Sequence, residues 1–126
     1  NLFICAPAVS QAAALGAFDG REELEENVAR YARNRAFLME NLPNVGFREL
    51  VPADGGFYLY ADVSGFTDDS LPFSREMLDE AGVAATSGVD FDETRGTRYL
   101  RFSYAGTYED MQEAVERLSR WERLKG

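Results

Sequence analysis

Arg101 is the first residue whose type and surroundings could do chemistry, because it lies between Leu100 and Phe102 in an apolar, aromatic run. A guanidinium is seldom buried without an anionic partner. Its planar fork of donors suits a carboxylate, either of the protein or of a ligand. Alternation along a strand would place Arg101 on the same face as Tyr99 and Ser103. The pattern alone leaves two interpretations open: an anion-binding arginine, or the commoner solvated or ion-paired one.

Glycines could also line a site. Gly55 and Gly56 favour either a close backbone approach at the edge of a site or simply a tight turn that needs positive φ. The same two interpretations apply to Gly88 and Gly96. No dinucleotide or phosphate fingerprint followed by a helix appears at any of these glycines. The local pattern therefore favours turns.

Metal and acid–base chemistry have little support. The sequence has no histidine, which removes the commonest general base and the commonest transition-metal ligand. A carboxylate-only site for a hard cation stays open as an alternative, although the acids and glycines lack the spacing of a calcium loop. We therefore predict no metal site. We expect solvated loop charges at the remaining candidates: Asp68, Asp69, Asp90, Asp92, Glu93, Arg95 and Arg98.

Amine and thiol nucleophiles are scarce. Schiff-base chemistry needs a lysine in a protected pocket, and the only lysine is Lys125. The only cysteine, Cys5, has apolar neighbours, which predicts a small buried thiol rather than a nucleophile. One cysteine allows no intrachain disulfide, in keeping with a reducing cytoplasm. We predict no covalent catalyst in this sequence.

The composition limits the partners that these residues could serve. The 126 residues are 45% apolar and 13% aromatic, which predicts a packed core. A net charge of −9 argues against nucleic acid and against an anionic membrane surface. No apolar run approaches the roughly 18 residues of a membrane span. The sequence thus predicts neither a nucleic-acid partner nor a membrane partner.

The elements that must position these residues begin with two helices. An Ala-rich helix is expected over residues 10–18, with Ser10 as its cap and small side chains that suggest close packing. A second helix is expected over residues 21–42, with acids in its first turns. Its apolar stripe at helical spacing predicts core packing by Leu24, Val28, Tyr31, Leu38 and Leu42.

The remaining elements predict a small sheet with two more helices. A hairpin around a Gly-rich turn is expected from residues 45–50 and 57–63, and two further strands from residues 83–86 and 99–104. Helices are expected over residues 73–81, ended by Gly82, and 108–124, capped by Thr107, with a core stripe of Met111, Val115, Leu118 and Trp121. The predicted fold is α+β: a small mixed or antiparallel sheet with helices packed on one face, in a single domain over residues 1–126.

The first residues suggest a piece of a longer protein. The sequence opens on Asn1 without an initiator Met and runs directly into an apolar stretch, residues 2–9. Chain termini are usually polar and loose. If the sequence is such a piece, it should expose an apolar patch along residues 2–15.

Four segments, in this order, resemble the class I/II aminotransferases, the large fold-type-I pyridoxal-phosphate family. Residues 1–11, NLFICAPAVSQ, resemble the stretch that follows the cofactor lysine in aspartate-aminotransferase-like members. The Gly-rich lead-in to the central strand of the small domain resembles residues 52–58, PADGGFY. A family loop resembles residues 82–91, GVAATSGVDF, and the strand that ends the active-site set resembles residues 99–105, YLRFSYA. The resemblance covers essentially the whole sequence and implies the carboxyl-terminal small domain of such an enzyme.

The resemblance implies roles for three residues. Arg101 matches the family arginine that binds the substrate α-carboxylate, and Gly56 and Phe57 would lie near the substrate entrance. The Schiff-base lysine, the aspartate facing the pyridine nitrogen and most phosphate ligands of pyridoxal 5'-phosphate would lie upstream of Asn1, so this chain alone is expected to be inactive. The intact protein is implied to be a homodimer. Ser87 departs from the family, which usually has proline there.

The implied reaction of the whole protein is transfer of an amino group between an L-amino acid of the aspartate-like class and a 2-oxo acid. Pyridoxal phosphate would act as electron sink and amine carrier, and the small domain would bind the substrate carboxylate and close over it. Two alternatives stay open. One is a lyase, decarboxylase or acyltransferase of the same superfamily, because fold does not fix function. The other is a non-catalytic α+β ligand-binding module with covered apolar faces.

Overall fold

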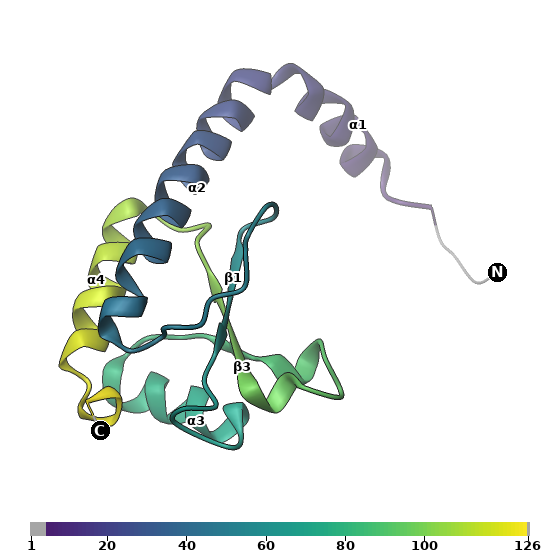
Figure 1. Cartoon of the computed structure of the whole chain (residues 1–126). Coiled ribbons are helices and arrows are strands. Elements are labelled where there is room, and N and C mark those ends of the chain that lie inside the picture. The colour runs from purple at the N-terminus through teal and green to yellow at the C-terminus, as the bar shows by residue number, and fades with distance from the viewer. Residues whose placement is uncertain (1–4, 126) are drawn as a thin grey trace.

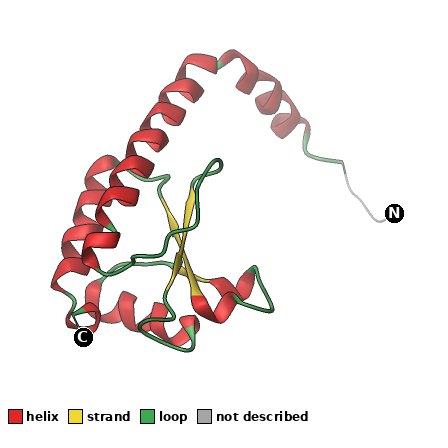
Figure 2. Ribbon diagram, in the orientation of Figure 1, coloured by secondary structure: helices red, strands yellow, loops and turns green. Residues whose placement is uncertain are grey.

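A computed structural model describes residues 5–125 of the chain. Its helices are α1 (Ala8–Gly16), α2 (Arg21–Asn41), α3 (Ser70–Glu76) and α4 (Tyr108–Arg120), and its strands are β1 (Tyr58–Asp62), β2 (Thr86–Ser87) and β3 (Tyr99–Ser103). Short helical turns join them: η1 (Ala17–Asp19), η2 (Pro43–Val45), η3 (Met77–Ala81), η4 (Gly88–Asp90), η5 (Gly96–Arg98) and η6 (Glu122–Leu124). Figure 1 shows α2 and α4 side by side along the sheet and α1 extending away from it. Figure 2 shows the strands in the centre of the molecule. The predicted α+β fold is confirmed.

The sheet has three antiparallel strands in the order β1-β3-β2. In the β1–β3 register, Leu59 is opposite Phe102 and Tyr60 is opposite Arg101. Burial alternates along both strands, so one face is buried and the other is partly open. The buried face carries Leu59, Ala61, Leu100 and Phe102, and the open face carries Tyr58, Tyr60, Tyr99, Arg101 and Ser103. This alternation confirms that Arg101 shares a face with Tyr99 and Ser103.

The hydrophobic core lies between the buried sheet face and the helices. Leu38 and Leu42 from the end of α2 meet Met111 and Leu118 of α4 there, and all four are nearly inaccessible to water. Their burial supplies most of the free energy that holds the sheet to its helices. The predicted core stripe of α4 is confirmed, with Trp121 buried and Val115 partly buried.

The apolar stripe of α2 packs over only half of its length, which corrects the prediction. Leu38 and Leu42 are buried, but Leu24 is 55% and Val28 66% exposed. The physical reason is visible in Figure 1, where the first half of α2 extends beyond α4 and the sheet. The amphipathic pattern was correctly identified, but the described chain offers no surface for the amino-terminal half of it.

α1 departs from the prediction in three ways. It begins at Ala8 with Pro7 as its N-cap, so Ser10 lies inside the helix and does not cap it. None of its residues is buried, although its small side chains predicted close packing. Cys5, predicted to be a buried thiol, is exposed, because the residues around α1 pack on nothing else in the described chain.

Of the two strands predicted for the hairpin, only the second forms, as β1, and the chain before it pairs with β1 at a single point. This pairing is an isolated bridge between Leu50 and Ala61, with a hydrogen bond from Val51 N–H to Tyr60 O at 2.8 Å. Phe47 instead turns fully into the core, after Gly46 at φ 121°. In this segment, burial of the Phe47 ring in the core takes the place of a regular hydrogen-bond ladder with β1.

The other boundaries shift for local reasons. α3 begins at Ser70, three residues early, because the Asp69 carboxylate accepts the Leu71 N–H at 3.0 Å. α3 and η3 then run to Gly82, which ends them at φ 66° as predicted. The strand expected over 83–86 is reduced to β2. Thr107 caps α4 as predicted, and the cap is a reciprocal capping box with Asp110. α4 ends at Arg120 rather than at residue 124.

Within the described residues, no helix combines the length and the apolar character that crossing a membrane requires.

Candidate functional site

Arg101 lies on the open face of the sheet with an aromatic ring on each side of its cation. Its guanidinium carbon is 4.0 Å from the centroid of the Tyr58 ring and 3.9 Å from the centroid of the Phe91 ring. The two rings form no aromatic pair with each other, so they approach the guanidinium from different sides. Cation–π stacking of this kind uses the faces of the guanidinium and leaves its in-plane N–H donors available.

The donors of Arg101 have no partner within residues 5–125. Its Nε is buried without a hydrogen bond, and no described carboxylate pairs with the guanidinium, whereas the neighbouring arginines Arg95 and Arg98 pair with Asp92 and Asp62. A hollow of about 320 Å³ opens beside it, lined by Tyr58, Ala84, Ala85, Thr86, Arg101 and Ser103. Among the described residues the geometry is not that of an ion-paired arginine, and it fits either a solvated or an anion-binding one. The arrangement can bind an anion at the edge of the guanidinium.

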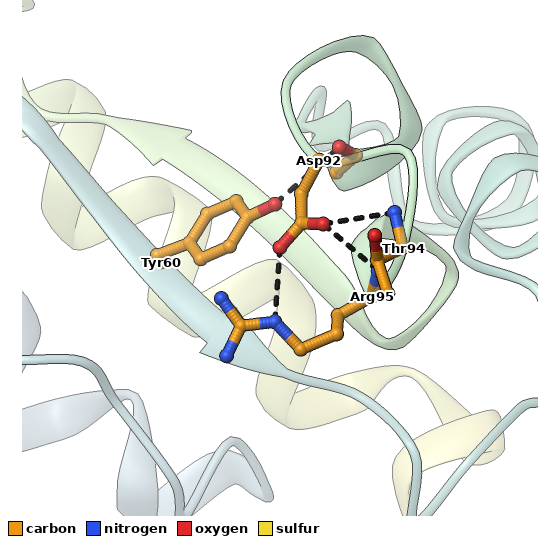
Figure 3. Close-up of polar contacts among 5 residues, drawn as sticks. Tyr60, Asp92, Thr94 and Arg95 are labelled. Carbon is orange, nitrogen blue, oxygen red and sulfur yellow. Dashed lines mark hydrogen bonds and ion pairs between the residues drawn. The ribbon is translucent and has the colours of Figure 1, made fainter.

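Asp92 organises the loop that carries Phe91 to the arginine. Its carboxylate accepts the backbone N–H groups of Thr94 and Arg95, both at 2.9 Å, and the Arg95 Nε at 3.1 Å (Figure 3). The backbone N–H groups of Arg95 and Thr94 hold the pKa of Asp92 below its usual range. Asp92 and Arg95 were predicted to be solvated loop charges, and this is wrong for Asp92. The acid is a structural anchor for the loop.

The same loop is closed by two glycines in van der Waals contact. A Cβ at Gly96 would overlap the carbonyl of Gly88 and lie 2.6 Å from Val89 Cα. Ser70 and Ser87 fasten the loop to α3, since their hydroxyls are 2.8 Å apart and Ser70 donates to Gly96 O at 2.9 Å. Gly88 and Gly96 therefore serve close backbone packing rather than a ligand. Ser87, the departure from the family pattern, is buried in this network.

Tyr60 and Tyr99 stack beside Arg101 on the open face, with ring centroids 4.7 Å apart. The Tyr60 hydroxyl donates to Gly88 O at 3.4 Å (Figure 3). Burial raises the pKa of Tyr60, the negative charge of Asp92 raises it further, and the positive charges of Arg95 and Arg101 oppose this. Tyr60 therefore stays a neutral donor near pH 7 and braces the loop against the sheet.

Gly56 and Phe57 lie at the turn that leads into β1. Gly56 has φ 71°, so the turn interpretation of this glycine is correct. Its carbonyl accepts the Tyr104 hydroxyl at 3.0 Å, and the Phe57 carbonyl accepts the Tyr104 N–H at 2.9 Å. The Phe57 ring contacts the Tyr58 ring, with centroids 4.3 Å apart, which links it to the aromatic surroundings of Arg101. Neither residue itself contacts Arg101 through an aromatic or hydrogen-bonding interaction.

A second hollow, of about 270 Å³, lies between the two long helices and the Gly82–Ala84 segment. Its charged side chains already have partners. Asp110 accepts the Thr107 N–H in the capping box, and Arg117 pairs with Glu113 and donates to Gly82 O. Its described charged side chains are therefore engaged within the fold, whereas Arg101 has no such partner, so Arg101 marks the better candidate.

Comparison with known proteins identifies the family. The model of the family described as "Aminotransferase class I and II" matches residues 1–118. This chain belongs to the class I and II aminotransferases. It is 46% identical over 123 residues to the valine–pyruvate aminotransferase of Mycobacterium tuberculosis, covering 96% of this chain and 32% of that protein. It is 35% identical to the (5-formylfuran-3-yl)methyl phosphate transaminase of Methanocaldococcus jannaschii, covering 94% of this chain and 31% of that protein.

Solved aminotransferase structures share the fold. An aminotransferase from Mycobacterium tuberculosis superposes with a TM-score of 0.90 at 46% identity, covering 96% of this chain and 32% of that one. An aromatic aminotransferase from Pyrococcus horikoshii superposes with a TM-score of 0.72 at 33% identity, covering 81% of this chain and 27% of that one. The chain thus spans about a third of the length of these relatives.

The family implies pyridoxal phosphate, but the residues of this chain do not fit its covalent attachment. Lys125, the only lysine, lies in the last turn after α4, and its Nζ pairs with Glu122 at 2.5 Å. Its side chain is half-exposed, whereas a Schiff-base lysine needs a protected pocket.

The residues around Arg101 were not predicted from the sequence. Tyr58 and Phe91 lie 43 and 10 positions away from Arg101 in the sequence, and neither was predicted to contact it. Thr86, opposite Arg101 on β2, was also missed. Phe91 closes the loop segment that carries the family resemblance, and this was the one available signal.

Proposed function

We propose that this chain is the small domain that binds the substrate carboxylate in a pyridoxal-phosphate-dependent aminotransferase. The whole protein would transfer an amino group between an L-amino acid and a 2-oxo acid. The observation that carries the proposal is the state of Arg101, whose two faces are stacked and whose buried Nε has no partner among the described residues. A carboxylate matches the planar donor fork in two parallel hydrogen bonds.

Arg101 contributes binding and orientation. Its guanidinium holds the α-carboxylate, and the stacked rings keep water from its faces, which strengthens the charge pair. Pyridoxal phosphate, bound by segments outside this chain, supplies the electron sink and the amine carrier. The carboxylate contact is made in the ground state and kept in the transition state, so it raises kcat/KM by tightening substrate binding.

The α-carboxylate is common to all candidate substrates, so Arg101 does not choose among amino acids. The resemblance suggested the aspartate-like class. The relative at 46% identity is named a valine–pyruvate aminotransferase, whereas an aspartate aminotransferase of Musicola paradisiaca is 32% identical. We therefore propose both amino-acid classes as test substrates.

The exposed apolar side chains support a piece of a larger enzyme over a free-standing binding module. Val9, Leu15 and Phe18 are 76%, 72% and 82% exposed, in the described part of the patch expected along residues 2–15 and just beyond it. Leu2, Phe3 and Ile4 of that patch lie outside the described residues. We propose that the intact protein is a homodimer and acts in the cytoplasm, to which the single cysteine is suited.

The test compares wild-type full-length protein with Arg101→Ala and Arg101→Lys at saturating pyridoxal phosphate. Amino transfer is measured from L-valine to pyruvate and from L-aspartate to 2-oxoglutarate. We expect Arg101→Ala to lower kcat/KM about 100- to 1000-fold, the effect of two lost charge-assisted hydrogen bonds. Arg101→Lys keeps the charge but loses the fork, so most of the loss should remain.

Arg75→Ala is the matched control, since Arg75 is exposed on α3, and we expect its kcat/KM to be unchanged. The visible absorbance of bound pyridoxal phosphate should appear with the full-length protein and not with the 126-residue chain. If the full-length protein binds no pyridoxal phosphate, the aminotransferase assignment is wrong and a binding module becomes the better hypothesis. If the full-length protein binds the cofactor but transfers no amino group, a lyase, decarboxylase or acyltransferase of the same superfamily becomes the better hypothesis.

A further inference from the structure

Phe91 is a large apolar residue that takes no part in the core. Its side chain is 54% exposed, and its ring lies 3.9 Å from the guanidinium carbon of Arg101. An aromatic ring held this close to a cation has a favourable electrostatic contact with it. Contact with Arg101 is thus the interaction that accounts for the position of this ring.

The two residues whose rings contact the Arg101 guanidinium, Phe91 and Tyr58, are each fixed by the hydrogen bonds of their own backbone segment. Phe91 follows η4, and its N–H donates to Gly88 O at 3.0 Å within the loop that Asp92 fastens. Tyr58 is fixed by the ladder between β1 and β3, where it is opposite Ser103. Because the loop and the strand are separately anchored, the guanidinium lies between two rings that cannot easily follow its rotation.

We propose that Phe91 and Tyr58 are positioning residues, which hold the Arg101 guanidinium in one plane and present its donor edge to the substrate carboxylate. This inference rests on the proposed function, because it concerns the same arginine. A long arginine side chain loses rotamer freedom when it binds a ligand. Rings that restrict the guanidinium beforehand remove that cost from substrate binding.

The inference predicts a specific kinetic pattern in the full-length protein. The carboxylate contact exists in both the ground state and the transition state, so weakening it raises KM and leaves kcat nearly unchanged. For Phe91→Leu we expect KM for the amino acid to rise about two- to fivefold, the value of one exposed cation–π contact. Phe91→Tyr should restore the wild-type KM, because it restores the ring.

Three further variants separate stacking from general packing. Tyr58→Phe keeps the ring and should leave KM unchanged, whereas Tyr58→Leu should raise it as Phe91→Leu does. Leu78→Ala removes an apolar side chain that is 51% exposed and is not among the described contacts of Arg101, and it should leave KM unchanged. A readout without turnover uses propionate, a carboxylate without an amino group. The rise in Tm that propionate causes should shrink in Phe91→Leu.

A double-mutant cycle tests the positioning role separately from the proposed function. In an Arg101→Lys background, Phe91→Leu should have little further effect on KM, because lysine offers no planar group to hold. If Arg101→Lys raises KM but Phe91→Leu changes it less than twofold in the wild-type background, the positioning role is wrong and the proposed function stands. If Arg101→Lys also leaves KM unchanged, both are wrong. A fall in kcat with unchanged KM in Phe91→Leu would also overturn the positioning role.

Discussion

At the scale of single residues, the site depends on contacts that leave little room for an added methyl group. Gly88 and Gly96 touch through their backbones, and the loop between them carries Phe91 and Asp92. Close approach, rather than positive φ, is what requires glycine at these two positions, since only Gly46, Gly56 and Gly82 have positive φ among the described residues.

Gly96→Ala tests this close contact. The new Cβ would overlap the Gly88 carbonyl, so the loop must shift, and we expect the free energy of unfolding to fall by about 1–3 kcal/mol. Gly55→Ala is the control: a Cβ added there would meet nothing within 4 Å, and its effect should stay within about 0.5 kcal/mol. Chemical denaturation followed by circular dichroism measures both. Equal effects of the two substitutions would contradict the contact.

At the scale of elements, α4 is the helix with the clearest local signals. Thr107 Oγ1 accepts the Asp110 N–H at 3.1 Å, and Asp110 Oδ2 accepts the Thr107 N–H at 3.0 Å. This reciprocal cap starts the helix where the chain leaves β3, and so sets where Met111 and Leu118 meet the sheet.

Removing the cap should weaken the whole helix–sheet layer. We expect Thr107→Ala to lower the free energy of unfolding by about 1 kcal/mol. Ser119→Ala deletes a hydroxyl of the same helix that donates only to Glu116 O on the exposed surface, and it should change stability by less than about 0.5 kcal/mol. Thermal unfolding of the two variants beside the wild type measures the difference, and a larger loss for Ser119→Ala would refute the cap.

The cap also makes stability depend on pH. Hydrogen bonds from the Thr107 side chain and backbone hold the pKa of Asp110 below its usual range. A carboxyl whose pKa is lower in the folded state stabilises the fold above its unfolded pKa, about 3.9, and loses this effect as the pH falls through the folded pKa. The Tm difference between wild type and Asp110→Asn should therefore narrow below about pH 4. A constant difference from pH 7 to pH 3 would show that this carboxyl does not contribute.

At the scale of the whole molecule, the described chain is divided into a packed part and an uncovered one. The sheet, α3, α4 and the second half of α2 share one core, whereas α1 and the first half of α2 extend away from it (Figure 1). The uncovered part exposes Val9, Leu15, Phe18, Leu24 and Val28. Exposed large apolar side chains concentrated in one part of a chain are typical of a surface that another structure covers.

The isolated 126-residue chain should therefore self-associate through this surface. We expect sedimentation to show a concentration-dependent increase in mass, and Leu15→Ser with Phe18→Ser to reduce it without lowering Tm, since neither side chain is buried. Leu78→Ser changes an exposed apolar residue, 51% exposed, on the packed part and should leave association unchanged. A monomeric wild-type chain at all concentrations would exclude association through this surface.

Sequence patterns alone were enough to predict the elements with strong local signals and the face on which Arg101 lies. Alternation in residues 99–103, the Thr107 cap and the αL Gly82 all act within a few positions, so they are visible without a fold. The surroundings of Arg101 became known only from the folded chain. Tyr58 reaches it through strand register, and Phe91 reaches it through a loop closed by contacts from Ser70 to Gly96. Such contacts join residues far apart in the chain, and their energy depends on packing that no local pattern encodes.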